Sequence, residues 1–468
     1  MVPKEYQLAG VEYALNRRNA LIGDAPGLGK TAECIMLGNA IEAGHTLVIC
    51  PASLRLNWER EIWMWSTQEN VSTYPVLKSK DGVSLRANYV ITSYAMLTNR
   101  SIFEAIMDAR WDHLILDEAH ALKDPKGNTR TKAICGWNDK GVDIDGLADV
   151  SGRITMASGT ILPNQPIECY NALRLLDHDA IDGMSMEAFR NAYYELGQGF
   201  INAFHEVQLP DGSWVKRREL HWSDRVRNVP ANLDDLQERL RGNVMVRRTK
   251  PQVLHELPPV QWHVFPLQMT ADIRRALKHP GWKQAETLYE MDAHAFDSSV
   301  PIDGAISTAR RLLGEASAPG IVAYLKDMLA EGVTKIVVGA WHHTVLDYMR
   351  EHLEPHGLVY MDGSTTMRNR QAAVDEFQEN DSIQIILGQM GPLGEGWTLT
   401  AAQDVVLAEF DWVPGRNEQF LDRISRLGQE GWYTLGHVPV VPDTLSERIL
   451  NTAIVKAQNI HKALDAIS

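Results

Sequence analysis

Short apolar runs alternate with helix-like stretches in two parts of this chain, and this alternation limits its fold more than any other feature. Such runs, bounded by turn residues, are typical of strands buried on both faces. Strands separated by helices predict parallel sheets covered by helices. We therefore predict an α/β protein with two lobes. The expected strands are Ala20–Gly23, Thr46–Cys50, Tyr89–Thr92, His113–Leu116 and Ile154–Ala157 in the first lobe, and Lys335–Gly339, Leu358–Tyr360, Ile383–Leu387, Asp404–Ala408 and Tyr433–Val441 in the second.

The stretch between the two sets of strands lacks this rhythm and is expected to contain helical insertions. With 468 residues, the chain is too long for one ordinary core. We assign residues 1–250 to an N-terminal lobe with a helical insertion from about residue 178. Residues 251–468 form a C-terminal lobe whose helical insertion extends to about residue 330 and which ends in a helix from Thr444.

Composition narrows the class of protein. Hydrophobic residues make up 44% and charged residues 23%, as in globular proteins. The net charge of −14 argues against non-specific coating of nucleic acid, so a nucleic-acid surface would have to be local. The cysteines show no zinc spacing, and dispersed thiols fit the cytosol. Neither a signal peptide nor an apolar run long enough for a bilayer is expected.

A glycine-rich segment, Gly23-Asp-Ala-Pro-Gly-Leu-Gly-Lys-Thr31, follows an expected strand and opens an expected helix. Glycines allow backbone N–H groups to surround phosphate oxygens, and the helix N-terminus attracts negative charge. Lys30 is expected to reach the β- and γ-phosphates of ATP, and the Thr31 hydroxyl to hold Mg²⁺. Asp24 departs from the usual phosphate-loop pattern, which has glycine at this position.

Paired carboxylates end the strand Leu114-Ile-Leu-Asp-Glu-Ala-His120. We expect Asp117 to hold Mg²⁺ and Glu118 to orient and deprotonate the attacking water. The competing interpretation is that both acids cap the following helix. Their place downstream of a phosphate loop favours the catalytic interpretation.

Arginines three residues apart, Arg423 and Arg426, lie in the late segment Gln419–Gln429. On one helical face of the second lobe they can stabilise the charge that develops on the γ-phosphate. Such residues are otherwise surface ion-pair partners. If they act on the phosphate, they do so only when the lobes close, which couples hydrolysis to motion.

A basic stretch lies between Lys216 and Lys250, where ten basic and five acidic residues give a local charge of +5. Two interpretations remain open: a solvated face or a surface that meets nucleic-acid phosphates.

The motifs together resemble those of superfamily 2 helicases, and within them the SNF2-type translocases on double-stranded DNA. The matching segments are Tyr6-Gln7, Asp24–Thr31, Val48–Trp58, Ile91–Tyr94, Asp117–His120, Ser158–Asn164, Asp362-Gly-Ser364, Gly394–Ala402 and Gln419–Gln429, with Val244–Lys250 and Leu257–Pro259 similar to the segment that joins the lobes. Ser158 and Ile161 depart from the family's T-G-T-P motif. Ala408–Gly415 is similar to the annealing-helicase branch.

The resemblance implies two RecA-like lobes and a set of ligand contacts. It implies that Gln7, Asp24, Gly27, Gly29, Lys30, Thr31, Gly394 and Gly396 bind ATP with Mg²⁺. It also implies that Ser53, Thr92, Ser93, Ser364, Arg247 and Arg248 contact nucleic acid. Short hydroxyls bond phosphates without reading bases, although each could instead be a turn or capping group.

The leading hypothesis is a DNA-dependent ATPase that translocates on double-stranded DNA, forked DNA included, and anneals or remodels DNA or displaces bound proteins. An RNA-dependent DEAH-type helicase is one alternative, and an ATP-gated DNA clamp without productive turnover is another. We expect a monomer without membrane attachment or further modules. A bacterial cytoplasm, or a host cytoplasm if the protein is phage-encoded, is the expected location.

Overall fold

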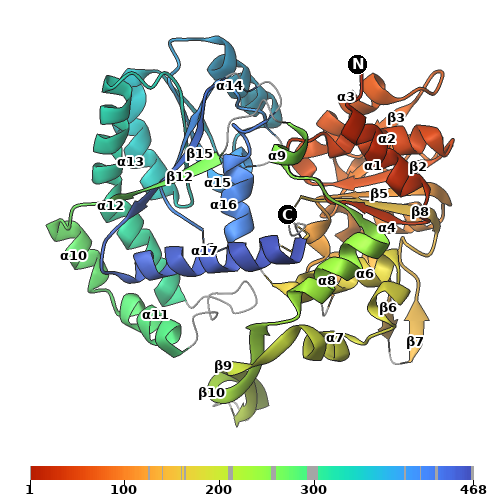
Figure 1. Ribbon diagram of the computed structural model, residues 1–468, viewed down its shortest axis with the longest axis horizontal. Helices are drawn as coiled ribbons and strands as arrows, with labels where there is room; N and C mark the ends of the chain where they lie inside the picture. Colours follow the sequence, from red (N-terminus) through yellow and green to blue (C-terminus); the bar gives the residue numbers. More distant parts are fainter. Residues whose placement is uncertain are drawn as a thin grey trace.

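The computed structural model describes residues 2–124, 127–139, 141–159, 161–162, 165–208, 214–254, 260–291, 304–394, 397–411, 413–426, 429 and 431–464. Two parallel sheets dominate these residues, one in each lobe (Figure 1). This confirms the predicted two-lobed α/β fold.

The first lobe is built on a seven-stranded sheet in the order β11-β1-β8-β5-β2-β4-β3, in which all neighbours are parallel. Its central strands are buried along most of their length because helices cover both faces. The strands are β1 (Ala20–Ile22), β2 (Thr46–Cys50), β3 (Thr73–Pro75), β4 (Tyr89–Ser93), β5 (Trp111–Asp117), β8 (Ser151–Ala157) and β11 (Met245–Val246). The helices are α1 (Glu5–Leu15), α2 (Lys30–Ala40), α3 (Arg55–Trp65), α4 (Arg100–Met107), α5 (Thr129–Cys135) and α6 (Tyr170–Leu176).

The insertion in the first lobe contains helices and also a long antiparallel ribbon that the sequence analysis did not predict. The ribbon consists of β9 (Tyr194–Gln208) and β10 (Trp214–Pro230), and it projects away from the sheet (Figure 1). Both segments are rich in aromatic and β-branched residues, which favour strands over helices. The helices α7 (Met186–Tyr193) and α8 (Leu233–Arg239) lie on either side of it in the chain.

The second lobe is built on a six-stranded parallel sheet in the order β12-β17-β16-β13-β15-β14. The strands are β12 (Val260–Pro266), β13 (Ile336–Ala340), β14 (Leu358–Met361), β15 (Ile385–Gln389), β16 (Asp404–Leu407) and β17 (Thr434–Val440). The helices are α10 (Ala271–Leu277), α11 (Pro280–Met291), α12 (Gly304–Ala330), α13 (His343–Leu353), α14 (Met367–Glu379), α15 (Met390–Leu393), α16 (Pro414–Leu421) and α17 (Leu445–Leu464). The short helix α9 (Lys250–Val253) lies in the chain between the two sheets.

The closing helix α17 starts in the second lobe and ends against the first (Figure 1). Leu450 belongs to the core of the second lobe, whereas Ile460 and Leu464 are buried in the core of the first. Within the described part of the chain, none of the helices combines the length and the apolar composition that crossing a membrane requires.

Candidate active site

The glycine-rich loop connects β1 to α2, as the sequence predicts. Gly27 and Gly29 adopt φ values of +88° and +85°, in the left-handed region that glycine enters without strain. Lys30 donates from Nζ to the Asp24 carbonyl oxygen at 2.8 Å. Burial lowers the pKa of Lys30, while the charges of Glu118, Asp24 and Asp117 act in the opposite direction. The ammonium group therefore lies within electrostatic reach of these acids.

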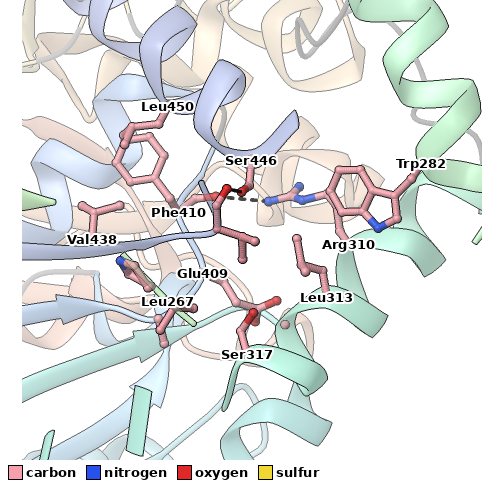
Figure 2. Close-up of a pocket in the computed structure, with 14 residues that line it drawn as sticks. Leu267, Trp282, Arg310, Leu313, Ser317, Glu409, Phe410, Val438, Ser446 and Leu450 are labelled. Carbon is pink, nitrogen blue, oxygen red and sulfur yellow. Dashed lines mark hydrogen bonds between the residues drawn. The ribbon is translucent and has the colours of Figure 1, made fainter. Parts of the chain in front are cut away.

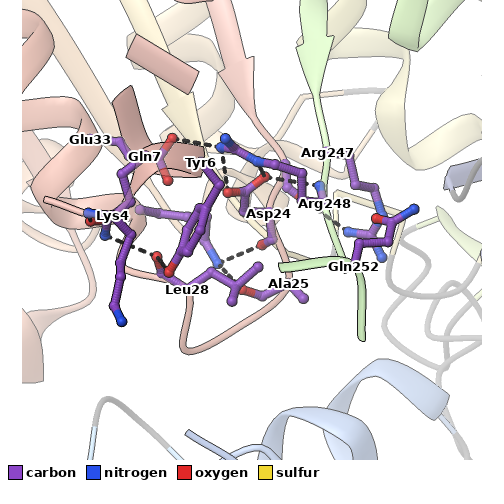
Figure 3. Close-up of polar contacts among 12 residues, drawn as sticks. Lys4, Tyr6, Gln7, Asp24, Ala25, Leu28, Glu33, Arg247, Arg248 and Gln252 are labelled. Carbon is purple, nitrogen blue, oxygen red and sulfur yellow. Dashed lines mark hydrogen bonds and ion pairs between the residues drawn. The ribbon is translucent and has the colours of Figure 1, made fainter. Parts of the chain in front are cut away.

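Asp24 is fully buried, and its carboxylate is held by Arg248. The guanidinium donates from Nε to Oδ1 at 2.9 Å and from Nη2 to Oδ2 at 2.6 Å, and it also reaches Glu33 at 2.8 Å (Figure 3). Arg247, beside it, donates to the carbonyl oxygens of Gly23 at 2.7 Å and Gly159 at 2.9 Å. The acid in place of glycine thus anchors the loop, and its side chain is not available to ATP.

These contacts correct the expectation that Arg247 and Arg248 bind nucleic acid. Arg247 is buried, and only 14% of the Arg248 side chain is exposed. Both guanidinium groups bind carboxylates or carbonyl groups inside the lobe, so neither is presented to a phosphate at the surface. Both arginines instead brace the loop from the segment after β11.

The first helix closes the other side of the loop. Tyr6 donates from its hydroxyl to the Leu28 carbonyl oxygen at 3.0 Å, and Gln7 donates from Nε2 to the same oxygen at 3.1 Å. The Gln7 amide is thereby positioned on the loop next to Gly29, where a Cβ would lie 2.3 Å from Nε2. Contact between Gln7 and the nucleotide base stays a prediction.

The carboxyl pair lies at the end of β5, where neighbouring elements hold it. Trp58 donates from Nε1 to Oδ2 of Asp117 at 2.7 Å, and the Tyr94 hydroxyl donates to the Asp117 carbonyl oxygen at 2.8 Å. Glu118 has a φ of +50°, which is rare for a residue with a side chain and turns its carboxylate away from the strand direction. His120 lies 3.2 Å from this carboxylate.

The two acids have opposite electrostatic environments. Burial raises the pKa of Asp117, and the neighbouring charge of Glu118 adds to the effect. Burial acts to raise the pKa of Glu118 as well, but the contact with His120 and the charges of Lys30 and Arg423 outweigh it and lower that pKa. Glu118 therefore stays ionised near neutral pH.

Gln419 of α16 and two arginines after it meet this carboxylate and the loop from the second lobe. Arg423 and Arg426 lie in the turn that follows α16, and not on one helical face as expected. Gln419 lies 3.4 Å from Glu118, measured from Nε2 to Oε1. Arg426 covers the loop so closely that a Cβ on Gly27 would lie 3.0 Å from its Cγ. Arg423 is buried and contributes to the low pKa of Glu118. Both arginines thus lie where groups that stabilise γ-phosphate charge are required, and that role stays a prediction.

The residues present fit the Mg²⁺ that accompanies ATP. Thr31 lies in the first turn of α2, and Asp117 is the last residue of β5 in the sheet of the first lobe. Both offer the hard oxygen ligands that Mg²⁺ prefers. Among the described residues, no group of three His, Cys, Asp or Glu side chains could hold a metal ion by itself. The remaining ligands would be phosphate and water oxygens.

Gly394 ends α15, and the contacts that surround it come from the second lobe. A Cβ there would lie 2.4 Å from the Met390 carbonyl oxygen, so the position requires glycine for packing. Gly396, expected beside it in the ATP site, lies outside the described residues. Binding of ATP by Gly394 stays a prediction.

The four hydroxyl residues expected to contact nucleic acid differ in exposure. Thr92 and Ser93 are buried in β4, the second strand from one edge of the sheet, which corrects the expectation that their hydroxyls meet phosphates. Ser53 lies in the short 3-10 helix Ala52–Leu54 and is partly exposed. Ser364 is exposed, and its hydroxyl donates to Asp362 Oδ1 at 2.7 Å, as in a turn that starts at an aspartate. Of the four, Ser53 and Ser364 reach the surface, and their contact with nucleic acid stays a prediction.

The residues of the basic stretch between Lys216 and Lys250 fall into two groups. Arg239 is paired with Asp235 and Asp182 at 2.9 and 2.8 Å, and Arg241 donates to the Leu464 carbonyl oxygen at 3.0 Å. These arginines hold the insertion and α17 in place, so the later part of the stretch is not a phosphate-facing surface. The side chains of the earlier part, on β10, lie outside the described ones.

A separate cavity of about 90 Å³ lies in the second lobe, beyond the carboxyl ends of β12, β16 and β17 (Figure 2). Leu267, Trp282, Arg310 and Ser317 line it, together with Glu409. The Glu409 carboxylate accepts from the backbone amides of two residues after β13, at 2.8 and 2.9 Å, and so caps that strand. None of the loop residues named above lines this cavity.

The loop around Lys30, the carboxyl pair and the arginines of the second lobe define a P-loop nucleotide-binding protein with two RecA-like lobes. The SNF2-related domain matches residues 6–312, and the helicase conserved C-terminal domain matches residues 320–428. Because the first match covers more than half of the chain, the chain belongs to the SNF2-related family.

Known relatives are similar over almost the whole chain. It is 27% identical to the SWI/SNF-related matrix-associated actin-dependent regulator of chromatin subfamily A-like protein 1 of Drosophila melanogaster, over 91% of this chain and 51% of that protein. It is 26% identical to the DNA annealing helicase and endonuclease ZRANB3 of Bos taurus, over 91% of this chain and 37% of that protein. The Sulfolobus solfataricus SWI2/SNF2 ATPase core in complex with dsDNA has a TM-score of 0.43 at 17% identity and covers 100% of this chain and 98% of that one. The chain spans about half the length, or less, of these curated relatives.

Several residues of the site were not singled out by their sequence. Trp58 was noted only as part of a motif, and its hydrogen bond to Asp117 gives it a role. Gln419 and Lys250 stood in matching segments without an assigned contact. Their partners lie far away in sequence, so no local pattern could have identified them.

Proposed function

We propose that this chain hydrolyses ATP in response to DNA and translocates on double-stranded DNA, remodelling or annealing DNA structures or displacing bound proteins. One observation carries the proposal: Gln419 and Arg426 of the second lobe touch Glu118 and the glycine-rich loop of the first. A site completed by both lobes makes hydrolysis depend on closure, and repeated closure can move a motor along a polymer.

The proposed roles follow from the geometry. Lys30 binds the β- and γ-phosphates in place of the loop carbonyl groups to which it now donates. Glu118 orients the attacking water and accepts its proton, because its ionised carboxylate lies at the loop, close to the charges of Lys30 and Arg423 and to Gln419. Arg423 and Arg426 stabilise the charge on the transferred phosphoryl group. Thr31 and Asp117 hold Mg²⁺, which would neutralise phosphate charge when bound.

Double-stranded DNA as the substrate is supported by the family and by the names of the relatives, which include a DNA annealing helicase. We propose that the chain acts as a monomer, that forked DNA is among its substrates, and that it works in a bacterial or infected-host cytoplasm.

An ATPase assay with duplex, forked and single-stranded DNA and with RNA tests the proposal. Duplex or forked DNA should raise the turnover number several-fold. The same stimulation by RNA, or none by any nucleic acid, would exclude a duplex-DNA motor. Annealing of complementary strands coated by a single-strand-binding protein would then separate remodelling from translocation alone.

A further inference from the structure

A short segment after β11 lies along the glycine-rich loop and is joined to it by backbone hydrogen bonds. The Gly23 amide donates to the Val246 carbonyl oxygen at 2.8 Å, and the Ala25 amide donates to the Arg248 carbonyl oxygen at 2.9 Å. With the guanidinium contacts of Arg247 and Arg248, these bonds make the segment one rigid unit with the loop. The segment and the loop are therefore expected to move together.

The same segment also contacts the second lobe through Lys250. Its Nζ donates to Asp422 Oδ1 at 2.5 Å and to the Ser425 carbonyl oxygen. Lys250 is 9% exposed, and only 17% of the Asp422 side chain is exposed. Separating the two members of a partly buried ion pair is unfavourable, because it leaves charges that water solvates incompletely.

Asp422 and Ser425 mark the two ends of the turn that presents the arginines. Arg423 follows Asp422 directly, and Arg426 donates from Nε to the Asp422 carbonyl oxygen at 3.0 Å. One ammonium group bound at both ends fixes this turn relative to the loop. A displacement of about 1 Å at a group that stabilises a transition state can lower a rate by about 100-fold.

We infer that Lys250 is a positioning residue that holds Arg423 and Arg426 of the second lobe against the nucleotide loop of the first, and thereby couples ATP turnover to lobe closure. The inference rests on the proposed ATPase function. It predicts a defect in turnover rather than in ATP affinity, because the loop that binds the phosphates stays intact.

Lys250→Met keeps the aliphatic stem and removes the charge. Titration with a fluorescent ATP analogue should give a dissociation constant within about twofold of wild type, while the DNA-stimulated turnover number falls about 10- to 100-fold. Lys250→Arg, which keeps a donor, should retain more turnover than Lys250→Met. Lys326→Met, on the exposed face of α12, is the matched control and should behave as wild type.

Asp422→Asn tests the same contact from the second lobe and leaves the segment that contains Lys250 unchanged. It should lower turnover in the same direction as Lys250→Met does, and the double variant should be no worse than Lys250→Met, because that variant already removes the contact with Asp422. If Lys250→Met fails to fold, as judged by its melting curve, Asp422→Asn carries the test. Wild-type turnover in both variants, additive defects, or equal losses of binding and turnover would overturn the inference. Lack of turnover in the wild-type protein would instead refute the proposed function.

Discussion

At the scale of single residues, the adjacent acids Asp117 and Glu118 show how one backbone turn separates two roles. Asp117 continues β5 and is held by Trp58, whereas the left-handed conformation of Glu118 directs its carboxylate toward Lys30 and the second lobe. The proposed metal ligand and the proposed proton acceptor are therefore neighbours in sequence with different surroundings.

Replacement of Glu118 by Gln should separate binding from chemistry. The amide keeps the shape but cannot accept a proton, so turnover should fall about 1,000-fold while ATP binding is retained. Single-turnover hydrolysis and equilibrium binding of an ATP analogue measure the two properties. Turnover close to that of wild type would show that another group activates the water.

His113 predicts a pH dependence of stability. It is fully buried in β5, where its Nε2 lies 2.7 Å from the Thr155 hydroxyl, and burial together with the charge of Arg153 lowers its pKa to about 3. In the unfolded chain it titrates near 6.5, so between pH 6.5 and 3 the unfolded state binds the extra proton. The free energy of unfolding should therefore fall as the pH falls through this window, by about 2 kcal/mol at pH 5 from this group.

His113→Asn removes the titrating group while keeping a polar side chain near Thr155. Urea unfolding at pH 7.5 and pH 5 should show a smaller loss of stability in this variant than in wild type, by the amount assigned to His113. Equal losses in both proteins would mean that His113 is accessible to protons in the folded state.

At the scale of secondary-structure elements, the sequence predicts the long buried strands of the parallel sheets well. It predicts the very short strand β11 and the two strands of the antiparallel ribbon poorly. Runs such as Thr46–Cys50 are recognisable because both faces are buried. The strand β11 has two residues, Met245–Val246, too few for any periodicity, and it exists because β1 offers an edge. The ribbon was not predicted, because charged residues interrupt the apolar residues of β10, and the other strands were recognised by uninterrupted apolar runs.

The candidate site divides in the same way. Lys30, Asp117 and Glu118 belong to local motifs whose spacing fixes their geometry, so they could be found from the sequence. The partners of Arg248 are 224 and 215 positions away, at Asp24 and Glu33, so the resemblance of its segment could not show that this arginine binds inside the lobe. Burial of Thr92 and Ser93 likewise depends on the whole sheet.

The element β10 carries the part of the basic stretch that stays a prediction as a phosphate contact. Replacing Arg217 and Arg218 by Gln should weaken DNA binding and reduce the slope of log affinity against log salt by about 2. Arg239→Gln is the control, since that arginine is paired with Asp182 and Asp235 and should leave the slope unchanged. Unchanged slopes in every variant would identify the β10 charges as a solvated face.

At the scale of the whole molecule, the described residues contact each other between the lobes near the cleft and along α17. Near the cleft, Lys250 contacts the turn with the arginines, and α17 crosses from the second lobe to the core of the first. Two separate contacts restrict the relative rotation of the lobes more than a single contact would. The α17 contact should therefore limit how far the cleft opens.

Removing the apolar anchor of α17 tests this. Ile460→Ser with Leu464→Ser should release the end of the helix, because each buried side chain contributes about 2–5 kcal/mol when it is removed from a core. Small-angle X-ray scattering should then show a larger radius of gyration, and turnover should fall while ATP binding by the first lobe is retained. Ile454→Ser, at a position 45% exposed on the same helix, controls for the loss of an apolar side chain from α17. A radius of gyration equal to that of wild type would mean that the contacts of Lys250, Gln419 and Arg426 hold the lobes together without α17.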